Sequence, residues 1–153
     1  EWEKAARGTD ERTYPWGNSE ITGERVNYCD INCSWINHRD NKQDDGYSET
    51  SPVGNYPEGA SPYGALDMAG NVWEWVYDWY DANYYSQSGN TNNPQGPDDT
   101  GEKVLRGGAY DLSQYLVYGT SGLWNLRASD RLKRYPGITS NLNGFRCVLP
   151  ATP

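Results

Sequence analysis

Few residues in this chain can support metal or nucleophilic chemistry through sulfur or imidazole. The 153 residues include three cysteines and a single histidine, His38. The chain therefore has too few Cys and His residues to make a zinc site or a Ser–His–Asp triad a reasonable expectation. The sequence also lacks an apolar run long enough to span a membrane. We expect neither a zinc enzyme nor a membrane-inserted protein.

Positive charge is scarce as well. Thirteen Lys and Arg residues stand against 21 Asp and Glu residues, which gives a net charge of −8. This imbalance argues against nucleic acid or an anionic membrane as a partner and suits a protein that binds cations. There is one Met and one Phe, but seven Trp and thirteen Tyr. The core is therefore expected to contain large aromatic side chains whose polar atoms need partners.

The cysteines divide into a close pair and a single residue. Cys29 and Cys33 lie near each other in the sequence, and Cys147 lies far away. The pair could form a local disulfide, which would indicate an oxidising, extracytoplasmic compartment. Two buried thiols would fit the sequence equally well. Cys147 has no obvious partner in this chain.

Short elements separated by long loops are expected, because the chain holds 17 Gly and nine Pro. Residues 1–7 are typical of a helix closed by Gly8. From Val72 onward the side chains alternate with the period of a strand, and the large aromatics at 73, 75, 77 and 79 share one face. The remaining expectations are strands at 104–110 and 144–150, with loops or irregular structure at 9–62, 81–101 and 111–143.

Oxygen-bearing residues stand before and within the aromatic strand. Their spacing would place carboxylate and carbonyl oxygens around one point, from Asp67, Gly70, Val72 and Glu74. Calcium prefers such a set, with a glycine where the chain turns sharply. We expect an unneutralised pair of carboxylates here to be costly, so that a structural cation is needed. The alternative is a turn ending at Gly70 and a strand whose Glu74 is merely solvated.

Several segments, in order, resemble the sulfatase-modifying, formylglycine-generating enzyme family. They are EWEKAARG, SPVGNYP, YGALDMAGNVWEWVYDWY, VLRGGAY, LRASDR and NGFRC, from residue 1 to about residue 148. The resemblance implies an α+β, irregular C-type-lectin-like fold with few short strands and many loops. It assigns 1–150 to a single domain. Because these segments match only the later part of the family's domain, we expect its N-terminal portion to be missing from this chain, and a second chain could complete it.

The resemblance implies structural calcium at one or two sites. The first set of ligands is Asp67, the backbone of Gly70 and Val72, and Glu74; the second set is Asn27, the backbone of Tyr28, Asp45 and the backbone of Tyr47. Gly46 would bend the chain so that the oxygens of Asp45 and Tyr47 point the same way. The loop between Asn27 and Asp45 looks longer here than in the enzymes, and a disulfide could tie it together.

The chain departs from the oxidases of the family at their copper site. In those enzymes two cysteines follow the RGG strand, and the matching positions here are on or near Leu112 and Val117. No cysteine occurs between residues 34 and 146, and Ala109 stands where the enzymes carry serine. Copper(I) needs soft thiolate ligands. We therefore expect no copper, no catalytic residues and no oxidase chemistry.

A non-catalytic binding module is the first functional hypothesis. The fold is also used by retroelement-diversified variable proteins, which vary the segment between RGG and GFR, here 109–143. Tyr115, Tyr118 and Trp124 lie in it among small polar residues, a mixture typical of adaptable recognition surfaces for a protein or peptide. These aromatics could instead pack beneath the loop as a small satellite core.

Two other functions stay open. The chain could be an enzyme of the same family that uses a different site. In that case Arg127, Asp130 and Arg131 would bind an anionic substrate, although these residues could equally form a structural ion-pair network. The chain could also be a structural subunit of an extracellular assembly, completed by a partner.

Overall fold

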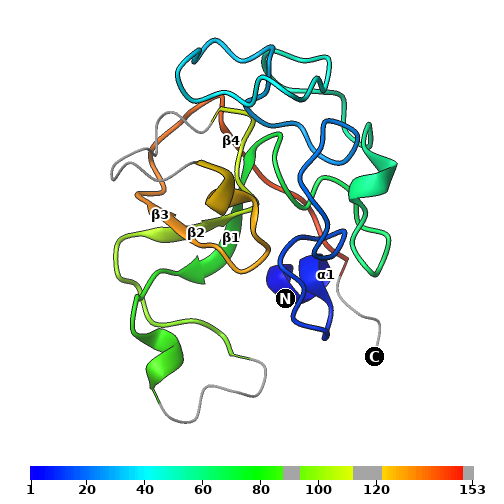
Figure 1. Cartoon of the computed structure of the whole chain (residues 1–153). Coiled ribbons are helices and arrows are strands. Elements are labelled where there is room, and N and C mark those ends of the chain that lie inside the picture. Colours follow the sequence, from blue (N-terminus) through cyan, green and yellow to red (C-terminus); the bar gives the residue numbers. More distant parts are fainter. Residues whose placement is uncertain (88–93, 112–121, 150–153) are drawn as a thin grey trace.

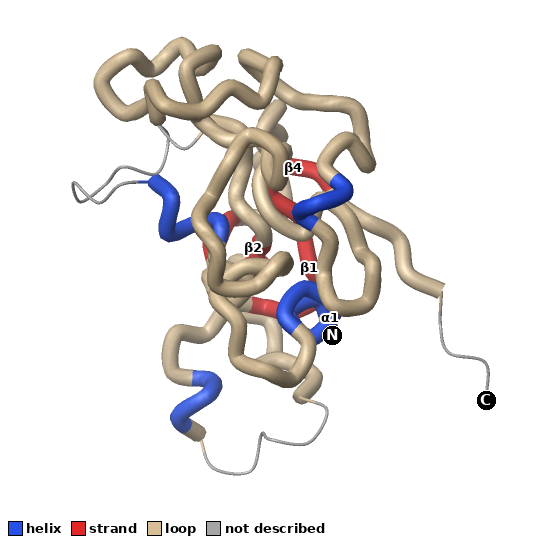
Figure 2. The backbone as a smooth tube through the Cα atoms, turned by 45° about the vertical axis from the view of Figure 1, so that its right-hand side comes forward, coloured by secondary structure: helices blue, strands red, loops and turns tan. Residues whose placement is uncertain are grey.

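The computed structural model describes residues 1–87, 94–111 and 122–149. A small sheet lies at the centre of the molecule (Figure 1), and most of the backbone around it is loop (Figure 2). The elements in chain order are α1 (Trp2–Arg7), the 3-10 helix Pro57–Gly59, β1 (Trp73–Trp79), the 3-10 helix Tyr84–Ser86, β2 (Lys103–Arg106), the 3-10 helix Gly122–Leu126, β3 (Leu132–Arg134) and β4 (Asn143–Gly144). This is the α+β, loop-rich architecture that the sequence predicts.

The four strands form one mixed sheet in the order β3-β2-β1-β4. β1 and β2 are antiparallel, with Glu74 opposite Arg106. β2 and β3 are also antiparallel, with Leu105 opposite Leu132. β4 runs parallel to β1 and places Gly144 opposite Glu74. The RGG and GFR segments, far apart in the sequence, therefore flank β1 on its two sides.

The predicted helix and the aromatic strand are confirmed, whereas the two other predicted strands are shorter than expected. Gly8 ends α1 with φ 68°, and its N–H donates to the Lys4 carbonyl at 2.9 Å. β2 stops at Arg106 because the two glycines that follow have φ of 92° and 79°, outside the extended region. The strand predicted at 144–150 is wrong beyond Gly144, since β4 pairs only at 143–144. β3 lies in the segment expected to be irregular and is too short to show an alternating pattern.

The alternation along β1 does not produce one buried aromatic face. Trp73 is fully buried, its neighbour Glu74 is 6% exposed, and Tyr77 is 86% exposed. The pairing with β2 shifts between Trp75 and Trp79, so the first half of the strand packs in the core and the second half leaves it. Lys103 covers this outer half, with its ammonium 3.9 Å from the centre of the Trp79 ring.

The core of the described residues consists of three small clusters, two of which contain large aromatic side chains, as the sequence predicts. They are Trp73 with Leu105, Ala109, Tyr110 and Leu142; Val26 with Tyr28, Ala69 and Leu126; and Ala6 with Met68 and Ala128. The second cluster fixes Tyr28, and the third fixes the turn before β1. Both acidic regions described below therefore rest on buried apolar residues.

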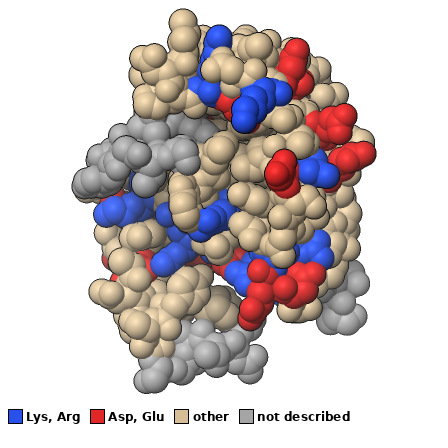
Figure 3. All heavy atoms as spheres, viewed as in Figure 1, with Lys and Arg blue, Asp and Glu red and all other residues tan. Residues whose placement is uncertain are grey.

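Charged side chains are not spread evenly over the face seen in Figure 3. Lys and Arg side chains gather across its middle, whereas Asp and Glu side chains lie mainly towards its right-hand edge. Within the described part of the chain, no helix has the length and apolar character that crossing a membrane requires.

Candidate cation site

The turn before β1 adopts backbone conformations that favour glycine and asparagine. Asp67, Gly70 and Asn71 all have positive φ, of 55°, 70° and 60°. A Cβ on Gly70 would lie 2.1 Å from the carbonyl oxygen of Asn27, so only glycine fits there. The Asn71 side chain accepts from and donates to the backbone of Ser51, at 3.1 and 3.2 Å. These contacts hold the turn firmly against the segment that carries Asn27.

The Glu74 carboxylate is buried and has a cationic partner. The guanidinium of Arg146 donates to both of its oxygens, from Nε at 2.6 Å and from Nη2 at 2.5 Å. The indole N–H of Trp2 donates to Oε2 at 2.6 Å. The Arg146 guanidinium also donates to the backbone carbonyls of Leu66 and Asp67, at 3.2 and 2.9 Å. The interpretation of Glu74 as a merely solvated residue is therefore wrong.

The other carboxylate of the first predicted set has a different partner. Oδ2 of Asp67 accepts from the N–H of Gly54 at 2.6 Å, and Arg146 contacts the Asp67 carbonyl instead of its side chain. Since Arg146 neutralises Glu74, the electrostatic reason for expecting a cation here no longer holds. Calcium binding by Asp67, Gly70, Val72 and Glu74 stays a prediction.

In the second predicted set, an aspartate is held by backbone and a buried acceptor has no partner. Asp45 accepts from the N–H groups of Tyr28 and Tyr47, at 3.0 and 2.8 Å. The Nδ2 of Asn27 donates to the Glu49 carbonyl at 2.8 Å. Asn27 is only 1% exposed, and its Oδ1 is buried and accepts no hydrogen bond. The structure thus joins the Asp45 carboxylate to the backbone of Tyr28 and Tyr47, and Asn27, next to Tyr28 in the chain, keeps an unused oxygen.

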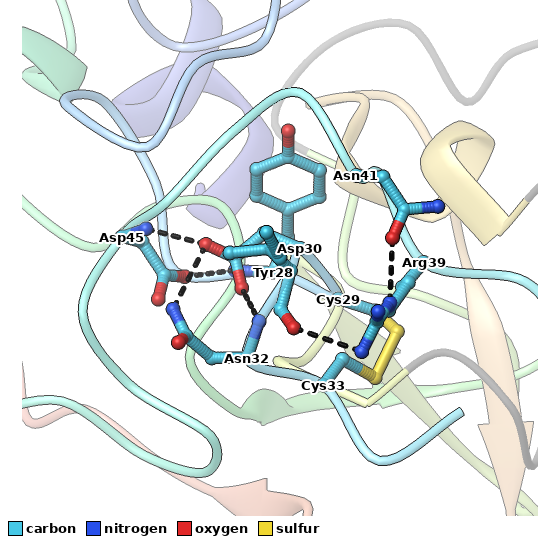
Figure 4. Close-up of a disulfide and its surroundings, with 9 residues drawn as sticks. Tyr28, Cys29, Asp30, Asn32, Cys33, Arg39, Asn41 and Asp45 are labelled. Atoms are coloured by element: carbon cyan, nitrogen blue, oxygen red, sulfur yellow. Dashed lines mark hydrogen bonds between the residues drawn. A yellow bond between two sulfur atoms is a disulfide. The ribbon is translucent and has the colours of Figure 1, made fainter. Parts of the chain in front are cut away.

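A second buried carboxylate, that of Asp30, lies beside Asp45. Asp30 is fully buried, and its carboxylate accepts from the backbone N–H of Asp45 and from that of Asn32, the latter at 2.8 Å (Figure 4). Neither aspartate belongs to any ion pair of the described residues. Burial raises the pKa of Asp45 to about 6, and the charge of Asp30 acts in the same direction. Two adjacent buried carboxylates without a cation are unfavourable.

The residues around Asp45 suit a hard cation. Carboxylate, amide and backbone carbonyl oxygens are the ligands that calcium takes, and Gly46 (φ 85°) forms the sharp turn between Asp45 and Tyr47. In the described ranges no three His, Cys, Asp or Glu side chains converge as a metal cluster, so a cation here would depend on Asn27 and on backbone carbonyls. An unsatisfied buried acceptor costs about 1–3 kcal/mol. Of the two implied sets, this one fits calcium better.

The disulfide between Cys29 and Cys33 is present, which confirms that prediction over the alternative of two buried thiols. Asp30 lies inside the loop that the disulfide closes (Figure 4). Cys147 is exposed and unbonded. The chain therefore contributes one free thiol in this structure.

Sequence reasoning missed three residues that shape the two acidic regions. Trp2 and Arg146 lie in the EWEKAARG and NGFRC segments that carry the family resemblance, and nothing in their spacing links them to Glu74. Asp30 carried a weak signal, because it is an acidic residue between two paired cysteines. Its contact with Asp45 depends on how the loop folds back, which spacing alone does not give.

The predicted recognition surface is described only in part. Tyr115 and Tyr118 lie outside the described residues, as do the copper-site positions Leu112 and Val117. Trp124 is 49% exposed, as a recognition residue must be. The guanidinium of Arg127 lies 3.6 Å from the centre of its ring. Ligand binding at this surface stays a prediction.

The Arg127, Asp130 and Arg131 group forms no ion-pair network among the described residues. Arg131 donates to the Asp81 carbonyl at 3.3 Å and lies over the Tyr85 ring. The backbone carbonyl of Asp130 accepts from a guanidinium on β2 at 2.9 Å, while burial raises the pKa of the Asp130 carboxyl. The contacts of Asp130 and Arg131 join loops to each other and to the sheet, and binding of an anionic substrate by this group stays a prediction.

Comparison with known proteins identifies the family. The sulfatase-modifying factor enzyme 1-like domain matches residues 1–151. The chain belongs to this family. It is 38% identical over 150 residues to the formylglycine-generating enzyme of Streptomyces coelicolor, covering 97% of this chain and 44% of that enzyme. It spans less than half the length of this curated relative.

Solved structures agree with the family assignment. The structure of PvdO from Pseudomonas aeruginosa matches with a TM-score of 0.67 and 23% identity, over 94% of this chain and 48% of that one, which supports the fold. The Treponema denticola variable protein 1 matches with a TM-score of 0.65 and 25% identity, over 95% and 43% of the two chains. Both likenesses concern the fold, and each covers less than half of the solved chain.

Proposed function

We propose that this chain is a calcium-stabilised, C-type-lectin-like module that binds a protein or peptide ligand in an extracytoplasmic compartment and does not oxidise cysteine. One observation carries the proposal. The chain has three cysteines, of which Cys29 and Cys33 are bonded to each other and Cys147 stands alone and exposed. A copper site of the oxidase type needs a pair of thiolates, and this chain does not supply one.

Calcium would act as a structural cation at the second set of ligands. Asn27 Oδ1, the Asp45 carboxylate and the carbonyls of Tyr28 and Tyr47 would hold it, and its charge would neutralise the buried acid. The support is the unpartnered Asn27 oxygen, together with the raised pKa of Asp45, whose carboxylate accepts the N–H of Tyr28, the residue after Asn27. Binding to the folded state alone would then stabilise that state by mass action.

Melting with and without a calcium chelator tests this role. The chelator should lower the melting temperature of the unaltered chain, and Asp45→Asn should remove most of that response. Asp98→Asn is the matched control, because Asp98 is exposed and should leave the response unchanged. A melting temperature that does not respond to the chelator would exclude structural calcium.

Ligand binding is proposed for the segment that follows β2. The likeness to the Treponema variable protein supports this assignment, as does the half-exposed Trp124. Large aromatics bury much area at low entropic cost, which is why recognition surfaces use them. Tyr115 and Tyr118 would complete the surface. An extracytoplasmic location is supported by the disulfide, because such bonds persist in oxidising compartments.

The second candidate function is oxidation of a cysteine in a substrate protein. The 38% identity to the Streptomyces coelicolor enzyme favours it. Copper ligands would then have to come from outside this segment. Incubation with copper and a sulfatase-type Cys-x-Pro-x-Arg peptide separates the two functions. We expect the mass of the peptide to stay the same, and stoichiometric conversion of its cysteine would overturn the proposal of a non-catalytic module.

A further inference from the structure

The loop from Cys29 to Cys33 is fixed at both ends and in its middle. The disulfide joins its ends, and the N–H of Cys33 donates to the Asp30 carbonyl at 3.0 Å. The N–H of Asp30 donates to the carbonyl of Tyr28 at 2.8 Å. The loop therefore has little freedom to turn the Asp30 side chain away from the interior.

The same loop is joined to the segment that leads to Asp45. The N–H of Asp40 donates to the Cys29 carbonyl at 3.0 Å, and that of Ile31 donates to the Gln43 carbonyl at 3.3 Å. The Tyr28 hydroxyl donates to Asp40 at 2.9 Å. Two stretches of chain that flank the loop are thus held in a fixed register.

The Asp30 carboxylate completes this connection at Asp45 itself. It accepts the Asp45 backbone N–H, while both Asp45 side-chain oxygens accept backbone N–H groups of other residues. Figure 4 shows the Asp30 and Asp45 side chains side by side, with the disulfide on the far side of the loop. A buried carboxylate is costly unless it is hydrogen-bonded and paired with a cation, and Asp30 has the hydrogen bonds but belongs to no ion pair of the described residues.

We propose that Asp30 is a positioning residue for the calcium site and that the Cys29–Cys33 disulfide holds it in place. Asp30 orients the Asp45 backbone before the cation arrives, and its negative charge adds to the attraction for a cation. Affinity rises when a ligand residue is already in its bound orientation, because less order is imposed on binding. This inference rests on the proposed calcium site around Asn27 and Asp45.

Calorimetric titration of the metal-free, oxidised chain with calcium tests the proposal. The variants are Asp30→Asn, which keeps the disulfide, and the pair Cys29→Ala and Cys33→Ala, which keeps the aspartate. Both should raise the calcium Kd at least tenfold, and the exposed control Asp98→Asn should leave it unchanged. Melting in chelator is the second readout. A purely structural role would lower the melting temperature equally with and without calcium, whereas positioning lowers the stabilisation that calcium adds.

The outcomes separate this proposal from the one on which it depends. If the unaltered chain binds no calcium, the calcium site and this inference fall together. If it binds calcium and Asp30→Asn binds equally well, only the positioning role is overturned. If Asp30→Asn does not fold, the cysteine pair decides, and an unchanged Kd in that variant overturns the role of the disulfide loop.

Discussion

The turn before β1 and the loops that carry Asn27 and Asp45 each contain two predicted side-chain ligands and two predicted backbone carbonyl ligands, but their charge is balanced differently. In the turn, the buried Glu74 is paired with Arg146, which arrives from a distant segment after β4. Around Asp45, the buried Asp30 carboxylate accepts the Asp45 backbone N–H, and no described ion pair includes either of these two buried aspartates. The same donor pattern can thus be neutralised by a side chain or left for a cation, and tertiary pairing decides which.

The largest expected effect on stability comes from removing the positive charge of Arg146, which neutralises Glu74 in the first region. Arg146→Met would leave Glu74 buried without a charged partner, and breaking a buried ion pair in this way costs about 3–5 kcal/mol. We expect the free energy of unfolding in chelator to fall by about 3 kcal/mol or more. Urea denaturation measures the change.

Lys4→Met is the control, since Lys4 is an exposed cation, and its effect should stay within about 0.5 kcal/mol. Repeating the Arg146→Met measurement in calcium sharpens the comparison. If Asp67 and Glu74 also bind calcium, the ion should restore much of the lost stability. A variant as stable as the unaltered chain would show that Arg146 does not neutralise Glu74.

The difference between the two regions also shows what the sequence could predict. Local features were predictable, because each depends on neighbouring residues: the helix closed by Gly8, the alternation that starts at Val72 and the turn at Gly46. For the Cys29–Cys33 pair, the sequence left a disulfide and two thiols equally open, and the structure has the disulfide. The family resemblance supplied the candidate ligands. The Arg146–Glu74 pair was not predictable, because it depends on β4 lying parallel to β1.

The same limit explains the errors in the strands. A strand of two or three residues, such as β3 or β4, has too few side chains to show an alternating pattern. The burial of Glu74 beside Trp73 contradicts simple alternation, because β1 has neighbours on both edges and packs in the core only over its first half. Spacing alone cannot report which half of a strand leaves the core.

A smaller loss of stability is expected when the unpartnered Oδ1 of Asn27, in the second region, is removed. Asn27→Ala removes that acceptor together with the hydrogen bond to the Glu49 carbonyl. In calcium, the variant should lose a ligand and most of the stabilisation that the ion provides, about 3 kcal/mol at a calcium concentration 100 times the Kd. In chelator the loss should be clearly smaller, because the unpartnered oxygen is removed as well. Unfolding in the two buffers measures this difference, and equal losses would mean that Asn27 is not a ligand.

The smallest effect is expected at Asp67, which occupies in the first region the place that Asp45 occupies in the second. Asn is the suitable replacement, because it tolerates the positive φ of 55° and keeps an acceptor for the Gly54 N–H while it removes the charge. Because Arg146 neutralises Glu74, we expect no calcium ion in this turn, and the charge of Asp67 then has no bound ion to stabilise. Asp67→Asn should therefore change the free energy of unfolding by less than about 0.5 kcal/mol, as surface substitutions do. It should also leave the response to chelator intact, whereas Asp45→Asn removes most of it.

Melting of both variants in calcium and in chelator makes the comparison direct. If Asp67→Asn abolishes the chelator response and Asp45→Asn does not, the cation belongs to the turn before β1, and our choice between the two regions is wrong.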